Sequence, residues 1–136
     1  MFDFNVFNSE KLADAGATLQ LVHPVTGDVV YVDDKQKKPC ELILKGSDCD
    51  IYLEFQQKKL NERSKHKNDD KIDFKKSIRE SADIYAKMTL GWSNIWHEGK
   101  ELEFNYKNAV MLYMTYKEIR VQVGNFIADK ENFIKG

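Results

Sequence analysis

The stretch PCELILKGSDCDIYLEF, residues 39–55, changes its hydrophobic period halfway along. Up to Gly46 it is typical of a short strand, because a run rich in aliphatic residues lies between a proline and a glycine. Beyond Gly46 the chain has no proline, and apolar residues recur three and four positions apart, which is the spacing of a helix. A sequence that passes from strands to helices in this way predicts an α+β fold.

Residues 1–46 form the β-rich part of this prediction. The runs ATLQLVH (17–23) and DVVYVDD (28–34) flank PVTGD, and a proline and a glycine between two β-branched runs are typical of a β-hairpin with a loop of several residues. PCELILKG (39–46) supplies a further strand. We therefore expect a small antiparallel N-terminal sheet of about three strands.

Residues 47–136 are predicted to be mainly helical, with about three or four helices packed on that sheet. Ser47 followed by Asp50 is typical of a helix start, and one face of that helix carries Ile51, Phe55 and Leu60. The apolar stripe ends there. KKLNERSKHKNDDK, residues 58–71, holds six Lys or Arg against three Asp or Glu, which indicates a solvated helix end and a charged linker.

Two further helical segments are expected. One begins near Asp70, with Asp73 in its first turn, and ends at Gly91, a typical stop residue. Helical spacing in it is kept by Phe74, Ile78, Ala82, Tyr85 and Met88. The other begins at the cap residue Asn105 and continues almost to residue 136, either as one long helix or as two shorter ones.

Length and composition favour one domain over residues 1–136, since single domains cluster at about 100 to 150 residues. The residues are 42% hydrophobic and 32% charged, and the formal net charge is -1, which gives no global field to attract nucleic acid or an anionic membrane. The first residues lack the pattern of a secretory signal, and no stretch approaches the roughly 18 apolar residues of a membrane helix. We expect a cytoplasmic protein with neither nucleic acid nor membrane as a partner.

No catalytic, cofactor-binding or metal-binding constellation stands out, so the chain is not expected to be an enzyme or to carry a cofactor. Cys40 and Cys49 lack the C-x-x-C spacing of a redox pair and are interpreted as reduced, largely apolar side chains. Surface, turn or capping roles are expected for the histidines and the acidic pairs, namely His23, His66, His97, Asp33–Asp34 and Asp69–Asp70.

The stretch GWSNIWHEGKELEFNYKNAVML, residues 91–112, joins the two later helical segments through an aromatic island. We expect Trp92, together with Ile95 or Trp96, to close one end of the core, and Trp92 to be largely buried. HEGKE then forms a turn, and ELEFN runs extended into a helix capped by Asn105.

The order of these motifs resembles that of the tail assembly chaperones of long-tailed bacteriophages. The similarity covers residues 84–134: the G-W-S-N start, a glycine-containing turn, the extended E-L-E-F, Asn-Ala before an aliphatic helix, and IRVQVGNFIADKENFI with its terminal DKENF. Residues before this region share only the organisation of a β-rich start followed by helices. Two departures stand out: Lys117 replaces a proline that many relatives have between the last two helical segments, and Asn105 and Asn108 replace the Ser or Thr cap with a following Glu that some relatives have.

This resemblance implies a protein of the host cell cytoplasm that binds the tape measure protein, keeps it soluble and helps to recruit tail tube subunits during virion morphogenesis. It also implies absence from the mature virion, and in many relatives a longer frameshift product with an extra C-terminal domain. The alternative is a permanent structural component of the phage tail or of the head–tail joint. A nucleic-acid-binding module or an enzyme is a third possibility, disfavoured by the near-neutral charge and the lack of a catalytic constellation.

A chaperone for a long amphipathic helix needs an apolar contact surface, and the C-terminal helical region offers more apolar residues than one stripe can bury. The candidate partner-binding residues are Val110, Met111, Met114, Phe126 and Phe133. The same surplus favours self-association, because many copies on one long partner add their weak contacts. The alternative is that these five side chains belong mostly to the core of a compact helical layer.

Overall fold

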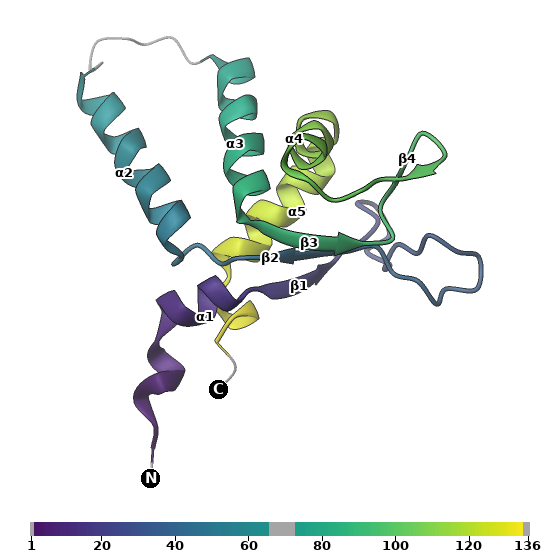
Figure 1. Ribbon diagram of the computed structural model, residues 1–136, viewed down its shortest axis with the longest axis horizontal. Coiled ribbons are helices and arrows are strands. Elements are labelled where there is room, and N and C mark those ends of the chain that lie inside the picture. The colour runs from purple at the N-terminus through teal and green to yellow at the C-terminus, as the bar shows by residue number, and fades with distance from the viewer. Residues whose placement is uncertain (1, 66–72, 135–136) are drawn as a thin grey trace.

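The structure is a computed structural model that describes residues 2–65 and 73–134, and its fold is α+β as predicted. A three-stranded antiparallel sheet lies across the middle of the molecule, with the long helices on one side of it and a short helix near its edge (Figure 1). The first part of the chain comprises η1 (Phe4–Phe7), α1 (Ser9–Ala15), β1 (Ala17–Gln20) and β2 (Glu41–Leu44). The second part comprises α2 (Asp50–Lys65), α3 (Phe74–Met88), β3 (Thr89–Ser93), β4 (Trp96–His97), β5 (Lys100–Glu101), α4 (Tyr106–Thr115), α5 (Lys117–Ala128) and η2 (Lys130–Asn132).

The sheet has the strand order β1-β2-β3, and both neighbouring pairs are antiparallel. Two of its strands were predicted, but the third comes from the GWSN stretch and not from the N-terminal part. The central strand β2 alternates as a half-covered strand should, since Leu42 and Leu44 are buried against the helices while Ile43 faces outward. The sheet therefore joins the N-terminal part of the chain to the helical part, and both contribute to a single core.

The predicted hairpin is only partly present. Its turn forms, with the Gly27 amide donating to the His23 carbonyl at 2.9 Å. The run 28–34, however, is not a strand: it makes isolated bridges, Val22 with Val29 and Tyr31 with Pro39. The carboxylate of Asp33 accepts the amides of Lys37 and Lys38, at 3.1 and 2.9 Å, and so bends the chain locally before a ladder can extend. The place beside β1 in the sheet belongs to β2.

The first long helix starts at Asp50, two residues later than a cap at Ser47 predicts. The Ser47 amide instead donates to the Ile127 carbonyl at 2.9 Å, which ties the entry of α2 to the end of α5. Leu60 is exposed, and α2 continues to Lys65, so the first half of the expected charged linker is helical. The rest of that linker, 66–71, lies outside the described residues.

Gly91 does not end a helix, contrary to the prediction. Helix α3 ends at Met88 and passes directly into β3, where Gly91 is paired with Ile43 of β2. The β-branched Thr89 lies two residues before the glycine and the aromatic Trp92 directly after it, and pairing with the buried strand β2 overrides the tendency of glycine to stop a helix. At the other end of α3 the cap is Asp73, whose carboxylate accepts the Lys76 amide at 3.1 Å, while Asp70 lies outside the described residues.

The C-terminal region forms two helices, although no proline separates them. Asn105 caps α4 as predicted, accepting the Asn108 amide at 2.8 Å. The break falls at Tyr116, whose backbone is extended (φ -114, ψ 98). Arg120 stabilises the break, because its Nη1 donates to the carbonyls of Tyr113 and Met114, at 2.7 and 3.0 Å, at the end of α4.

The aromatic island closes one end of the core through Ile95, which is buried. Trp92 is only partly buried, so the prediction that it is largely buried was too strong. Its indole nitrogen donates to the Leu102 carbonyl at 2.8 Å, and its ring packs edge-on against Phe104. The HEGKE turn forms the hairpin of β4 and β5, with Glu98 and Gly99 both at positive φ, as a two-residue hairpin turn requires.

A buried hydrogen bond connects α3, β3 and α4. Thr89 Oγ1 donates to the Tyr85 carbonyl at 2.7 Å, so it must accept its second bond from the hydroxyl of Tyr113, at 2.6 Å. Tyr113 is fully buried and its ring packs edge-on against Tyr85. The phenol of α4 is thereby fixed to the residue at which α3 becomes β3.

Ionisation of Tyr113 is predicted to destabilise the protein at alkaline pH. Burial raises the pKa of Tyr113 to about 12, whereas a tyrosine in an unfolded chain has a pKa of about 10. Since the folded-state pKa is the higher one, the stabilisation is complete below about pH 10 and is lost as the pH rises from about 10 toward 12, by roughly 2 to 3 kcal/mol. Urea unfolding of the native chain and of Tyr113→Phe across this range measures the effect: the variant should lose less stability, and an equal alkaline loss in both proteins would contradict the assignment.

Candidate partner-binding site

The five predicted contact residues do not form one exposed surface. Phe126 and Phe133 pack edge-on against each other, with ring centroids 5.6 Å apart, and Phe133 is buried. Val110 packs against the core, Met111 is partly buried, and Met114 is 41% exposed. Of the five, Met114 offers the most surface to a partner.

A large concave surface lies elsewhere, between α2 and α3. This α2–α3 groove has a volume of about 490 Å³. Its apolar lining consists of Ile51 and Phe55 from α2 and Ile84 from α3. Charged side chains make up the rest of its lining, namely Glu54, Lys58, Lys59, Glu62, Glu80, Asp83 and Lys87. An apolar strip bordered by charges of both signs is the pattern of a surface that holds an amphipathic segment.

The groove exists because α2 is packed against the body only through its first turns. Ile51, Tyr52 and Phe55 pack against the core, and the rings of Tyr52 and Phe55 are 6.0 Å apart. Beyond Phe55 the helix has no buried residue up to Ser64, and in Figure 1 the axes of α2 and α3 lean apart toward their far ends. The sequence carried a signal of this arrangement, since the apolar stripe of α2 stops early, but the stripe alone did not reveal which helix would face it.

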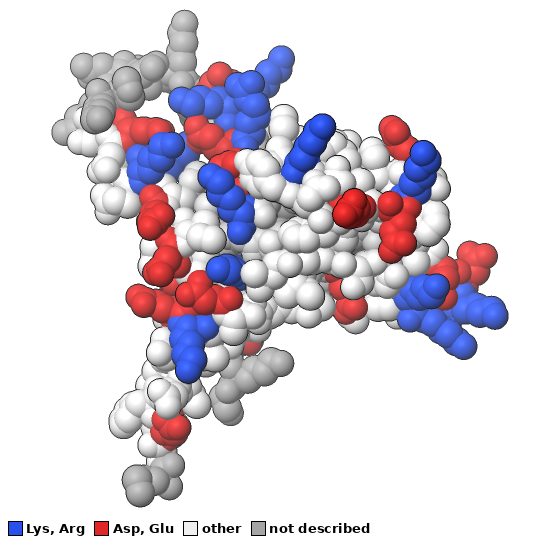
Figure 2. All heavy atoms as spheres, in the orientation of Figure 1, with Lys and Arg blue, Asp and Glu red and all other residues white. Residues whose placement is uncertain are grey.

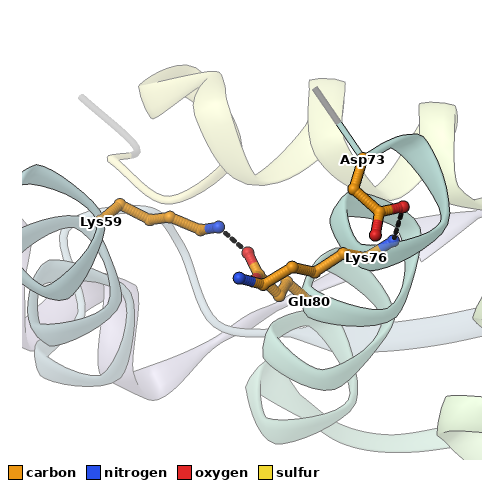
Figure 3. A network of polar contacts seen from close by, with 4 residues as sticks. All are labelled: Lys59, Asp73, Lys76 and Glu80. Carbon is orange, nitrogen blue, oxygen red and sulfur yellow. Dashed lines mark hydrogen bonds and ion pairs between the residues drawn. The ribbon is translucent and has the colours of Figure 1, made fainter. Parts of the chain in front are cut away.

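Ion pairs cross the groove and border it. Lys59 of α2 extends across to Glu80 of α3, which is also 3.9 Å from Lys76 of its own helix (Figure 3). Figure 2 shows that acidic and basic side chains are gathered over α2 and α3, whereas the area beside them, over the middle of β3, is largely uncharged. A partner therefore meets both signs of charge at the groove, and the Lys59–Glu80 pair, which is partly solvated, contributes little to stability on its own.

Asp83 lies at the α3 side of the groove and is kept ionised. Burial raises the pKa of this carboxyl, but a hydrogen bond from the Tyr106 hydroxyl and the nearby ammonium of Lys87 outweigh it, so the net pKa is lowered. The Lys87 nitrogen is 3.0 Å from Asp83. Because Tyr106 is the first residue of α4, this contact also links the groove to the helix that packs most extensively on α3.

The remaining polar candidates take structural positions. Cys40 and Cys49 form no disulfide, and burial raises the pKa of both thiols. The Cys40 thiol donates to the Asn94 carbonyl at 3.1 Å. 

His23 accepts the Val25 amide at 3.2 Å within its turn, and the His97 ring is 2.9 Å from the Tyr116 hydroxyl, while His66 and the pair Asp69–Asp70 lie outside the described residues. Among the residues that the structure describes, no group of three His, Cys, Asp or Glu side chains is placed to hold a metal ion.

Comparison with known proteins gives no match among protein-family models, curated proteins or solved structures. Within residues 2–65 and 73–134, no helix has the length and apolar character needed to cross a membrane. The function is therefore argued from the groove and from the motifs of residues 84–134.

Anchoring of α2 through its first turns predicts a contrast between two substitutions on that helix. Phe55→Ala removes a partly buried ring and should lower the free energy of unfolding by about 1 to 3 kcal/mol. Leu60→Ala removes a side chain that is 59% exposed and should change it by less than about 0.5 kcal/mol. Urea denaturation measures both variants, and equal effects would show that α2 is not anchored in this way.

Proposed function

We propose that this protein binds an amphipathic helical segment of a larger partner in the α2–α3 groove, and that it acts as a tail assembly chaperone for the tape measure protein. The observation that carries the proposal is the groove itself, about 490 Å³ in volume, with apolar residues from two helices along its lining and charges of both signs beside them. A helix laid into a groove of this kind buries its apolar face and leaves its polar face in water. The motifs of residues 84–134 support the choice of partner.

The geometry gives this activity a simple physical basis. A long amphipathic helix without its final partners exposes an apolar stripe, and such stripes drive aggregation. Ile51, Phe55 and Ile84 cover a short length of that stripe, so many copies of the chain are needed to cover a long partner. Because α2 is packed only through its first turns, a small change in its tilt can fit the groove to different segments.

The rest of the proposal follows the resemblance. The chain acts in the host cell cytoplasm, needs no cofactor and performs no catalysis. Tail tube protein is recruited to the coated tape measure protein through a longer frameshift product, and the chaperone is absent from the mature virion. A permanent structural component of the tail or of the head–tail joint is the alternative, and mass spectrometry of purified virions separates the two, since stoichiometric presence in the particle rejects the chaperone.

Co-expression with the tape measure protein of the same phage is the direct test. We expect the partner to remain soluble and to co-purify with this chain. Phe55→Glu places a charge in the apolar lining and should reduce the captured amount at least about tenfold, because an unpaired charge in a desolvated contact costs several kcal/mol. Circular dichroism of the variant shows whether it remains folded.

Two matched substitutions locate the contact. Leu60→Glu introduces the same charge at an exposed position of the same helix that does not line the groove, and should leave capture unchanged. Met114→Glu tests the surface favoured by the sequence and should also have little effect; loss of capture in this variant alone would place the contact on α4. If the tape measure protein precipitates equally with and without the chain, the chaperone function is wrong.

A further inference from the structure

Three exposed phenylalanines project from the body near the beginning of the chain. The rings of Phe2, Phe4 and Phe7 are 62%, 73% and 64% exposed, and η1 contains no buried residue. Their centroids are 5.3, 5.4 and 6.0 Å apart, so the rings pack on one another. Figure 1 shows this segment, here called the phenylalanine arm, extending away from the sheet and the long helices.

The arm is ordered locally although it lacks contacts that would bury its rings. Asp3 caps η1, with its carboxylate accepting the Asn5 amide at 2.9 Å, and Asn8 caps α1 by accepting the Lys11 amide at 3.1 Å. A cluster of three rings held out into water loses hydrophobic stabilisation that any apolar cover would supply. Such a cluster is therefore expected to have a docking site on another molecule.

The α2–α3 groove matches the arm in size. A cavity of about 150 Å³ accommodates one benzene ring, so the groove volume of about 490 Å³ corresponds to roughly three rings. Its apolar lining includes the aromatic ring of Phe55, which can pack edge-on against an incoming phenylalanine.

The groove lining holds both signs of charge, and one of its lysines can meet the single charge of the arm. Asp3 is the one charged side chain among residues 2–8. Lys58 lines the groove and forms no ion pair with any residue in the part of the chain that the structure describes, whereas Lys59 and Lys87 are paired with Glu80 and Asp83. Lys58, whose charge acts on Asp83 only from beyond ion-pair distance, can therefore meet the carboxylate that accompanies the rings.

We propose that the phenylalanine arm of one copy occupies the α2–α3 groove of a second copy. Because the arm points away from its own body, the contact joins two different surfaces, and repeating it produces a ring or an open chain of copies. The inference goes beyond the proposed function and does not depend on which partner protein the groove binds.

The area of this contact indicates weak association. Three rings of about 200 Å² each, roughly two-thirds exposed, bury about 400 Å², or about 800 Å² with the facing groove surface. A stable interface buries about 1,200 Å² or more. Copies therefore associate only at high concentration, and a helical partner that fills the same groove displaces the arm.

Sedimentation velocity over a concentration series of the full chain tests the arm. The native chain should form oligomers at high concentration, and the triple variant Phe2→Ser, Phe4→Ser, Phe7→Ser should remain monomeric throughout. Phe74→Ser is the matched control, because Phe74 is also 73% exposed but belongs to neither the arm nor the groove, and it should associate as the native chain does. A native chain that stays monomeric, or a triple variant that associates normally, overturns the proposal.

A mixing experiment tests the groove. Lys58→Glu, at an exposed position, should weaken association several-fold by repelling Asp3, and Phe55→Glu should abolish it while circular dichroism confirms folding.

Neither the arm variant nor the Phe55→Glu variant should associate alone, yet a mixture should form heterodimers, since one supplies the groove and the other the arm. Full association of both groove variants alone would show that the arms pack on each other and would overturn the proposal. Capture of the tape measure protein by the arm variant is measured separately, so failure of either idea is distinguishable.

Discussion

The hydrogen bond from Tyr113 to Thr89 is the contact on which the rest of the molecule depends. Thr89 is the residue where α3 becomes β3, and its hydroxyl also donates to the Tyr85 carbonyl one turn earlier. A buried phenol needs a partner for its proton, so α4 can pack on α3 only in the register that brings Tyr113 to Thr89. That register places β3 against β2 and closes the core between the sheet and the helices.

The remaining elements are attached to this core by progressively fewer contacts, from α5 to α2 to the phenylalanine arm. Helix α5 is attached through Arg120 at the end of α4 and through the bond from Ser47 to the Ile127 carbonyl. Helix α2 is attached through its first turns, and the phenylalanine arm makes its ring contacts within itself. The two least supported parts are thus the ones that offer apolar surface, and this is why both take part in the proposed binding.

Sequence patterns predicted the features that depend on local chemistry. The fold class follows from the change of period at Gly46, and the Asn105 cap and the HEGKE turn depend on neighbouring residues alone. The errors arose where distant residues decide. Gly91 lies in a strand because β2 is there to pair with it. The sequence left open whether the C-terminal region forms one helix or two, and the break at Tyr116 depends on Arg120 reaching back to α4. The position of the groove could not be predicted, because the apolar stripe of α2 shows where that helix stops packing but not which helix lies opposite it.

Hydrogen exchange in dilute solution tests the central claim, that α2 is anchored at its beginning and leaves an open groove beside α3. We expect the amides of α4 and of the second half of α3 to be strongly protected from exchange. The amides of Lys59 to Lys65 in α2 should exchange much faster than the amides of α4. Addition of a groove-binding partner should slow exchange in this half of α2. If the isolated, monomeric chain already protects the whole of α2 as strongly as α4, the helix is packed along its full length and the account is wrong.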